Sequence, residues 1–273
     1  MARFRRGMSP AVLTAFLIVA VIRPAAAGPM PGMPAKDGAP TAPVRDVRIV
    51  REHPHDPEAF TQGLLFHGGF LYESTGLRGR SSLRKTALES GAVFSIRRLP
   101  KDQFGEGLAR LGERLIQLTW RSGVIHVYDR KTFRLLASVA YPREGWGLAC
   151  DGKRLVASDG TDRLYFMDPR TFRTLRSIAV TDRGRPVDRL NELEWVEGRI
   201  LANVWESDRI ARIDPDSGRV EEWIDLAVLR ERLRGTPAGA ANGIAWDAAR
   251  RRLLVTGKNW PLLFEVIMDE TDR

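Results

Sequence analysis

The sequence lacks several features that stabilise or anchor other proteins of its size. It has one cysteine, Cys150, among 273 residues, so an internal disulfide is excluded and packing must supply the stability. No apolar run approaches the roughly 20 residues that a membrane-spanning helix needs. Histidines are also scarce, and the four present (His53, His55, His67 and His126) do not form a spacing typical of a metal site. His53 and His55 read as a surface loop pair, and we expect no metal.

Blocks of like charge are missing as well. The formal net charge is +9, but four of the arginines lie in the first 27 residues, which contain no acids, and subtracting them leaves +5. In the rest of the chain, arginines are interspersed with acidic residues. This pattern predicts a solvated, charged surface and no nucleic-acid partner.

The N-terminus has the composition of a secretory signal. Three arginines within the first six residues precede an apolar run over residues 11–22, and three alanines follow at 25–27. Charged, apolar and small-residue regions in this order are typical of an export signal. We expect cleavage after about Ala27, export to the periplasm, and no membrane contact after cleavage; an uncleaved anchor is the alternative.

Two regions follow the expected signal. Residues 28–43 are rich in Pro, Gly and Ala and predict a disordered tether. Residues 44–273 are long enough for one large domain with a sizeable core. With no obvious interface in the sequence, we expect a monomer.

The folded part repeats one pattern. Each unit has a short apolar strand, a polar turn containing Gly or Asp, and a second apolar strand. Alternating runs with an Asp turn follow three of the units, at 124–141, 163–180 and 209–226, and predict third and fourth strands. The units begin at Gly63, Gly107, Gly147, Glu192 and Gly243.

Five units of about 40–50 residues have the repeat length of four-stranded propeller blades. The sequence therefore predicts an all-β fold, a five-bladed β-propeller of four-stranded antiparallel blades. The fifth unit runs out of chain after Val266, and we expect the strand at 47–50 to supply its missing outer strand. Residues 226–234 have apolar residues at helical spacing and predict a short helix before the last unit.

Equivalent positions of successive blades should form rings around the central channel. The position before each first strand is polar or aromatic in every unit. The end of the antiparallel second strand should lie on the same face. Both rings should therefore face one mouth of the channel, whose polar and aromatic lining suits a small-molecule site. The first ring is Gln62, Glu106, Trp146, Asn191 and Asn242, and the second is Gly76, Trp120, Gly160, Trp205 and Lys258.

Each of these residue types has a simpler interpretation. The tryptophans could be plugs that fill the channel. Asn191 and Asn242 could form turns by bonding local backbone, and Glu106 with Lys258 could be a structural ion pair. Their joint occurrence on one predicted face favours a binding site.

Many short motifs along the chain also carry a resemblance to a known family. Together they resemble the glutaminyl-peptide cyclotransferases of the plant and bacterial type over residues 60–266. The resemblance implies a metal-independent five-bladed propeller without a cofactor. It also implies conversion of the N-terminal glutaminyl residue of peptides or proteins into pyroglutamate, with release of ammonia. The motifs are FTQGL, YESTGLRGRSSLR, FGEGL, YDR, GWGLACDG, SDGT, RLNELEW, NGIAWD and VTGKNWPLLFEV. Trp205, which lies between RLNELEW and NGIAWD, is also part of the resemblance.

The resemblance also assigns roles to residues. It places the family's proton-transferring glutamate at Glu106 and its polar substrate contacts at Gln62, Asn191 and Lys258. Asn242 joins the expected substrate-binding set through its ring position. The aromatic walls that the resemblance implies are Phe60, Phe104, Trp120, Trp146 and Trp205.

The reaction needs proton handling more than a nucleophile from the protein. The substrate's α-amine attacks its own side-chain amide carbon, so the reacting groups already share one residue. We expect Glu106 to accept the proton from the attacking nitrogen and to deliver it to the leaving ammonia. Lys258 or an amide of Gln62 or Asn191 would stabilise the charge that develops on oxygen.

Two other functions fit the ring residues. Propellers of the lactonase type hold Ca²⁺ in the mouth, and Glu106, Asn191 and Asn242 could supply oxygen ligands. Lys258 in the same mouth argues against a divalent ion, because two nearby positive charges repel. A non-catalytic peptide-binding propeller is the second alternative.

Overall fold

A computed structural model describes residues 42–268. The signal expected at 1–27 lies outside this range, as does the tether expected at 28–43 except for its last two residues. Ala42 donates a backbone hydrogen bond to Asp182 Oδ1 at 2.9 Å, and the Pro43 carbonyl accepts one from Trp223 at 2.8 Å. Both residues are therefore held by the folded part. Within residues 42–268, no helix is long and apolar enough to cross a membrane.

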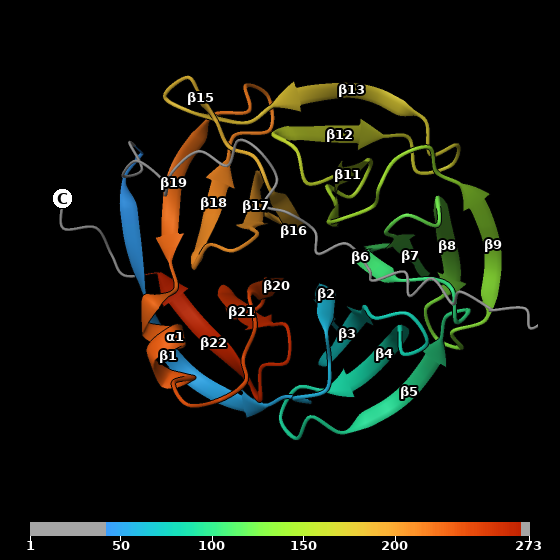
Figure 1. Cartoon of the computed structure of the whole chain (residues 1–273), viewed down its shortest axis with the longest axis horizontal. Coiled ribbons are helices and arrows are strands. Elements are labelled where there is room, and N and C mark those ends of the chain that lie inside the picture. Colours follow the sequence, from blue (N-terminus) through green and yellow to red (C-terminus); the bar gives the residue numbers. More distant parts are fainter. Residues whose placement is uncertain (1–41, 269–273) are drawn as a thin grey trace, which may run out of the picture. The chain divides into compact units, whose positions relative to one another are not determined.

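The described chain is built from β-strands, and three antiparallel sheets of four strands follow one another along it (Figure 1). In each sheet the strands pair in chain order. The first sheet contains β2 (Thr61–His67), β3 (Phe70–Thr75), β4 (Ser82–Ala87) and β5 (Val93–Arg98). The second contains β6 (Gly105–Leu111), β7 (Arg114–Thr119), β8 (Val124–Asp129) and β9 (Leu135–Ala140). The third contains β10 (Leu148–Cys150), β11 (Leu155–Ser158), β12 (Arg163–Met167) and β13 (Thr174–Ala179).

The remaining long strands form an eight-stranded sheet in the order β16-β17-β18-β19-β1-β22-β21-β20. Its parts are β16 (Leu190–Val196), β17 (Arg199–Val204), β18 (Arg209–Ile213), β19 (Val220–Asp225), β1 (Val44–Pro54), β22 (Leu262–Met268), β21 (Arg252–Gly257) and β20 (Ala241–Asp247).

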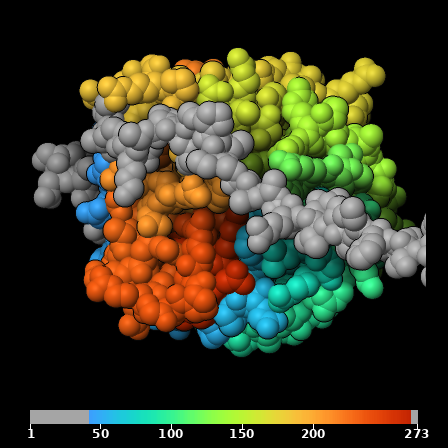
Figure 2. Space-filling model, viewed as in Figure 1, coloured from blue at the N-terminus to red at the C-terminus, as the bar shows by residue number. Residues whose placement is uncertain are grey.

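The N-terminal strand β1 joins the two halves of this sheet. It runs antiparallel to β22 from Val47 to Pro54 but pairs in parallel with β19 only from Val44 to Asp46. In the space-filling view, the blue N-terminal strand lies beside the red and orange C-terminal segments (Figure 2). The prediction that this strand completes the last unit is confirmed.

The first strand of each unit contacts the first strand of the next. These contacts join β2 to β6, β6 to β10, β10 to β16, β16 to β20, and β20 back to β2. Figure 1 shows β2, β6, β16 and β20 innermost, with β5, β9, β13 and β19 at the periphery. Hydrophobic clusters fill the spaces between neighbouring sheets; Leu64 and Leu71, for example, pack with Ala245 and Leu254. This packing closes the circle of contacts between the start and the end of the chain.

The Asp turns expected between third and fourth strands are present. Asp129 Oδ1 accepts hydrogen bonds from the backbone and hydroxyl of Thr132. Asp168 bonds Thr171 in the same way, and Asp214 bonds Ser217. Side-chain caps of this kind stabilise tight turns.

The short helix expected near 226–234 is α1 (Ala227–Arg232). One hairpin was not expected: β14 (Thr181–Asp182) pairs with β15 (Arg185–Pro186). Its two turn residues, Arg183 and Gly184, both have positive φ angles, which suits a two-residue hairpin turn. Its strands have two residues each, too few to show an alternating pattern.

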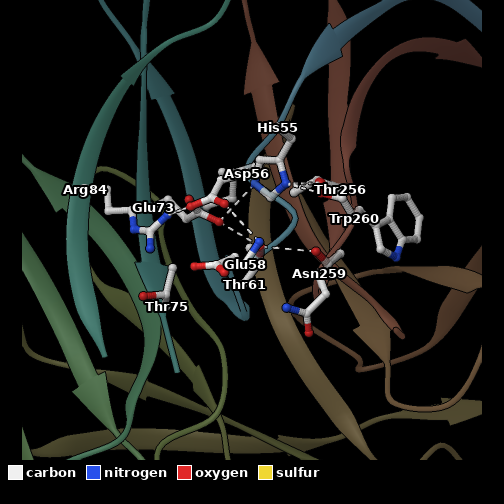
Figure 3. Close-up of polar contacts among 12 residues, drawn as sticks. His55, Asp56, Glu58, Thr61, Glu73, Thr75, Arg84, Thr256, Asn259 and Trp260 are labelled. Atoms are coloured by element: carbon white, nitrogen blue, oxygen red, sulfur yellow. Dashed lines mark hydrogen bonds and ion pairs between the residues drawn. The ribbon is translucent and has the colours of Figure 1, made fainter. Parts of the chain in front are cut away.

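The expectation that His53 and His55 lie on the surface is wrong. His53 is 2% exposed and lies 3.4 Å from Glu265. The ring of His55 lies between Glu73 and the segment Thr256–Trp260 (Figure 3). Acidic side chains on adjoining strands pair with both histidines, so their burial is tolerated.

The His55 side chain pairs with the buried carboxyl group of Glu73. Its Nδ1 lies 2.7 Å from the Trp260 carbonyl and its Nε2 lies 3.1 Å from Glu73 Oε1, so both ring nitrogens face acceptors. Burial lowers the pKa of His55, but the charge and hydrogen bond of Glu73, together with the Trp260 carbonyl and the charge of Asp56, outweigh burial and raise it. Burial raises the pKa of Glu73, but His55, with Arg84 and the Thr61 hydroxyl, outweighs burial and holds that pKa below its usual value. This ion pair connects the loop after β1 to β3 and to the turn between β21 and β22.

Candidate active site

Glu106 lies on β6 between two glycines and is 4% exposed. A Cβ at Gly107 would overlap the backbone of Leu148 on the next sheet. The missing side chain lets the two strands approach, and the Gly107 amide donates to the Trp146 carbonyl at 2.6 Å. The glycine therefore fixes the backbone beside Glu106 against the neighbouring sheet.

Four influences set the protonation of Glu106. Burial raises its pKa well above the usual value, while the positive charge of Lys258 and a hydrogen bond from Gln62 lower it. The negative charge of Glu144 raises it further. Burial dominates, so Glu106 takes up a proton at a higher pH than an exposed glutamate does.

Lys258 reaches the same site from the end of β21. It is 9% exposed, and burial lowers its pKa while Glu106 raises it. Its Nζ lies 5.0 Å from the centre of the Phe60 ring. Between Lys258 and Glu106 the structure has no direct ion pair, so the lysine acts on the carboxyl group through its charge. The interpretation as a structural ion pair is therefore not supported.

Two amides from different sheets meet beside Glu106. Gln62 Oε1 accepts a hydrogen bond of 2.7 Å from Asn242 Nδ2, and the same nitrogen donates to the Thr61 carbonyl at 3.1 Å. The carbonyl of Gln62 is thus occupied by Asn242, and its amide nitrogen is left for Glu106. The expected neighbourhood of Gln62, Glu106 and Asn242 is present.

Three buried oxygens of the site have no hydrogen-bond partner: Glu106 Oε2, Asn191 Oδ1 and Asn242 Oδ1. Buried acceptors are almost always paired in folded proteins, so these three are suited to donors from a ligand. Neither asparagine bonds the backbone of its own turn. The interpretation of Asn191 and Asn242 as turn formers is therefore not supported.

Aromatic rings form one wall of the site. Phe60 and Phe104 meet edge to face, with ring centres 6.0 Å apart. Phe104 meets Trp120 in the same manner at 5.7 Å. These three side chains come from the starts of the first two units and the end of β7.

A second aromatic pair comes from the third and fourth units. Trp146 and Trp205 lie 5.9 Å apart with their planes at 77°. Trp205 is 38% exposed, and Trp120 and Trp146 are half-buried. Tryptophans that plug a channel would be fully buried, so these rings are better described as walls that a ligand can touch.

Glu144 belongs to the site and was not expected from the sequence. Its Oε2 accepts hydrogen bonds from the indole nitrogens of Trp120 at 2.9 Å and Trp146 at 3.3 Å. Its Oε1 accepts from Arg121 at 2.8 Å. Glu144 thus links the two aromatic groups. It lies outside both predicted rings, and its position two residues before Trp146 was the only available signal.

The glycines of the second ring make room for these aromatic side chains. A Cβ at Gly76 would overlap the Phe104 ring, and one at Gly160 would lie 2.7 Å from the Trp146 ring. The expected rings therefore interlock: small residues of one ring accommodate large residues of the other. Among residues 42–268, no group of three or more His, Cys, Asp or Glu side chains is placed to hold a metal ion.

Comparisons with known proteins point to one family. A family model described as glutamine cyclotransferase matches residues 20–268. A glutaminyl-peptide cyclotransferase from Arabidopsis thaliana is 46% identical over 228 residues, which are 82% of this chain and 71% of that protein. The crystal structure of Myxococcus xanthus glutaminyl cyclase superposes with a TM-score of 0.80 at 42% identity, covering 84% of this chain and 100% of the other.

Proposed function

The chain belongs to the glutamine cyclotransferase family and is a glutaminyl-peptide cyclotransferase, and we propose that Glu106 performs its proton transfers. This acyltransferase acts on peptides with an N-terminal Gln. The observation that supports the proposal is the position of Glu106. It is buried, it is held by Gln62, and one of its oxygens has no partner in the protein.

The substrate presents donors to the unpartnered acceptors of the site. An N-terminal Gln carries N–H groups on its α-amine and on its side-chain amide. Asn191 Oδ1 and Asn242 Oδ1 accept from these groups, and Glu106 Oε2 faces the attacking amine. The aromatic walls (Phe60, Phe104, Trp120, Trp146 and Trp205) hold the side chain folded back, which brings the amine close to the amide carbon.

The reaction then needs one proton carrier. The amine nitrogen forms a bond to the γ-carbonyl carbon, and Glu106 accepts the proton that this nitrogen loses. The C–N bond to the side-chain nitrogen breaks, and Glu106 returns the proton to it so that neutral ammonia leaves. A raised pKa suits both steps, because it makes the carboxylate a better base for the amine, and the carboxylic acid that forms can then deliver its proton to the leaving nitrogen.

Charge on the γ-carbonyl oxygen has to be stabilised while the ring closes. Lys258 and the Asn191 amide nitrogen supply the donors for this oxygen. Gln62 has a different role, because its amide nitrogen donates to Glu106 and its carbonyl is taken by Asn242. It orients the carboxyl group toward the substrate.

We also propose that residues 44–268 form five propeller blades. The eight-stranded sheet divides at β1, which meets β19 over three residues and continues along β22. The halves are β16–β19 and the set β20, β21, β22 and β1. The circle of contacts between first strands supports this division.

The sequence also supports proposals about where the enzyme acts and what it binds. We propose that residues 1–27 direct export to the periplasm, and that the mature enzyme is a monomer that needs no metal and binds neither membrane nor nucleic acid.

Ammonia release from a short peptide with N-terminal Gln tests the proposal. We expect the purified chain to release ammonia equally with and without a chelator. Glu106→Gln should lower the rate by about 10²–10⁴-fold while circular dichroism and melting temperature stay close to wild type. Near-normal turnover in this variant would exclude Glu106 as the proton carrier.

A further inference from the structure

One position of the repeat breaks its own pattern. The residue directly after each first-ring residue in the sequence is glycine in four units and glutamate in the remaining unit. These residues are Gly63, Gly107, Gly147, Glu192 and Gly243. The glycines allow close approach of neighbouring inner strands, since a Cβ at Gly107 or Gly147 would overlap backbone atoms of the next strand. Glu192 instead places a long, ionisable side chain among the inner strands.

The carboxyl group of Glu192 connects three inner strands. The residue is 0% exposed. Its Oε1 accepts a hydrogen bond of 3.2 Å from the backbone N–H of Leu64 on β2, and its Oε2 accepts one of 2.9 Å from Ile244 on β20. Glu192 itself lies on β16. The fixed carboxyl group therefore ties β2 and β20 to β16.

These three strands carry three polar residues of the proposed site. Asn191 directly precedes Glu192, and Gln62 and Asn242 each lie two residues before one of its backbone donors. We propose that Glu192 is a positioning residue for catalysis, which fixes Gln62, Asn191 and Asn242 relative to one another by holding their strands together. This inference rests on the proposed function of the site.

Two backbone N–H groups oppose the effect of burial on the pKa of Glu192. Burial raises its pKa well above the usual value and neighbouring Glu194 raises it further, while the N–H groups of Leu64 and Ile244 lower it. Both oxygens act as acceptors, so an amide in place of the carboxyl group could serve only one of the two N–H groups. The other N–H would face a donor, and burial makes such an unpaired group costly.

Glu194 provides a matched control on the same strand. Its Oε1 accepts a hydrogen bond of 3.1 Å from the Trp246 backbone, and shielding from water raises its pKa to about 8. It lines a cavity of about 460 Å³ together with Arg110 and Trp246. Its bonded partner Trp246 is four residues beyond Asn242, so its loss should leave the site residues in place.

The experiment compares Glu192→Gln and Glu194→Gln in the full chain, by melting temperature and by kcat and KM for a peptide with N-terminal Gln. We expect Glu192→Gln to lower kcat/KM about tenfold or more, because small displacements of reacting groups are costly. Glu194→Gln should stay within about twofold of wild type. Glu192→Asp keeps the carboxyl group but shortens its reach to β2 and should also lose activity, and it replaces Glu192→Gln in the comparison if that variant does not fold.

A double-mutant cycle separates positioning from general stability. In an Asn242→Ala background, Glu192→Gln should cost less than it does in wild type, since one of the residues that it positions is already gone. The inference is wrong if folded Glu192→Gln and Glu192→Asp turn over at the wild-type rate. It is also wrong if Glu194→Gln loses as much activity as Glu192→Gln. Simple additivity of the losses caused by Glu192→Gln and Asn242→Ala in the double mutant would contradict it as well. Absence of ammonia release by the wild-type chain would instead contradict the proposed function.

Discussion

Gln62 and Asn242 hold each other in one orientation through the 2.7 Å hydrogen bond between Asn242 Nδ2 and Gln62 Oε1. Asn242 Nδ2 is itself anchored by the Thr61 carbonyl. With its carbonyl occupied, Gln62 can present only its amide nitrogen to Glu106. The orientation of the carboxyl group that we propose as the proton carrier thus depends on a residue from the last unit of the chain.

Replacing Asn242 by Asp should reverse this arrangement. An aspartate accepts but does not donate, so Gln62 would turn its amide nitrogen toward residue 242 and its carbonyl toward Glu106. The hydrogen bond that lowers the pKa of Glu106 would be lost. We expect kcat/KM to fall about tenfold or more, with the acid limb of its pH profile at higher pH than in wild type.

Asn242→Ala is the control for this reversal. It removes the anchor without adding charge and leaves Gln62 free to adopt either orientation. Steady-state kinetics at several pH values should show a smaller loss than in the Asp variant. An alanine variant more damaged than the aspartate variant would contradict the proposed orientation of Gln62.

The charge of Glu144 should be visible in the pH profile. It raises the pKa of Glu106, and a base must be deprotonated to act. Removing the charge with Glu144→Gln should lower that pKa, so the acid limb of kcat/KM should move to lower pH. The glutamine carbonyl can still accept from Trp120 or Trp146. Glu113→Gln removes an exposed acid bound to Arg130 and should leave the limb unchanged.

Lys258 should act in the opposite direction. Its positive charge lowers the pKa of Glu106, so Lys258→Met should raise that pKa and move the acid limb to higher pH. The maximal rate should also fall, by about 10²-fold, if the lysine stabilises charge on the reacting oxygen. Measuring kcat/KM from pH 5 to 9 separates the two effects. A limb that moves to lower pH would contradict the assigned proximity.

The repeat in the sequence predicted much of the site because it relates distant residues by position. Gln62 and Asn242 are 180 residues apart, yet both occupy the position before a first strand, and they form a hydrogen bond. Lys258 was expected on the same face from its place in the second ring, whereas only the family resemblance pointed to Phe60, whose ring centre lies 5.0 Å from Lys258 Nζ. Strand alternation and turn residues were sufficient to predict the ring positions because the units are regular.

Residues outside the regular pattern could not be predicted in this way. Glu144 lies in a loop between ring positions, and only the structure reveals that two indoles converge on it. Glu192 occupies a glycine position, but its partners come from two other units. The pairing of His55 with Glu73 joins segments from different strands, and no local spacing encodes it. Such contacts depend on three-dimensional packing.

The His55–Glu73 ion pair should give stability its own pH dependence. The pKa of His55 is raised in the folded chain, so its contribution is fully present below the unfolded value of about 6.5 and is lost as pH rises through the folded value. The pKa of Glu73 is lowered, so its contribution is lost only in acid. We therefore expect the contribution of this pair to the melting temperature to fall as pH rises above neutrality.

His55→Gln isolates the contribution of the imidazole. A glutamine amide can donate to Glu73 but does not titrate, so the variant should lose less stability than wild type between pH 6.5 and 9, as measured by thermal unfolding. His67→Gln is the matched control, because the pKa of His67 is lowered and its titration is shifted to the acid side, away from that range. Its slope should equal that of wild type. Equal slopes for all three proteins would mean that His55 is not charged in the folded chain.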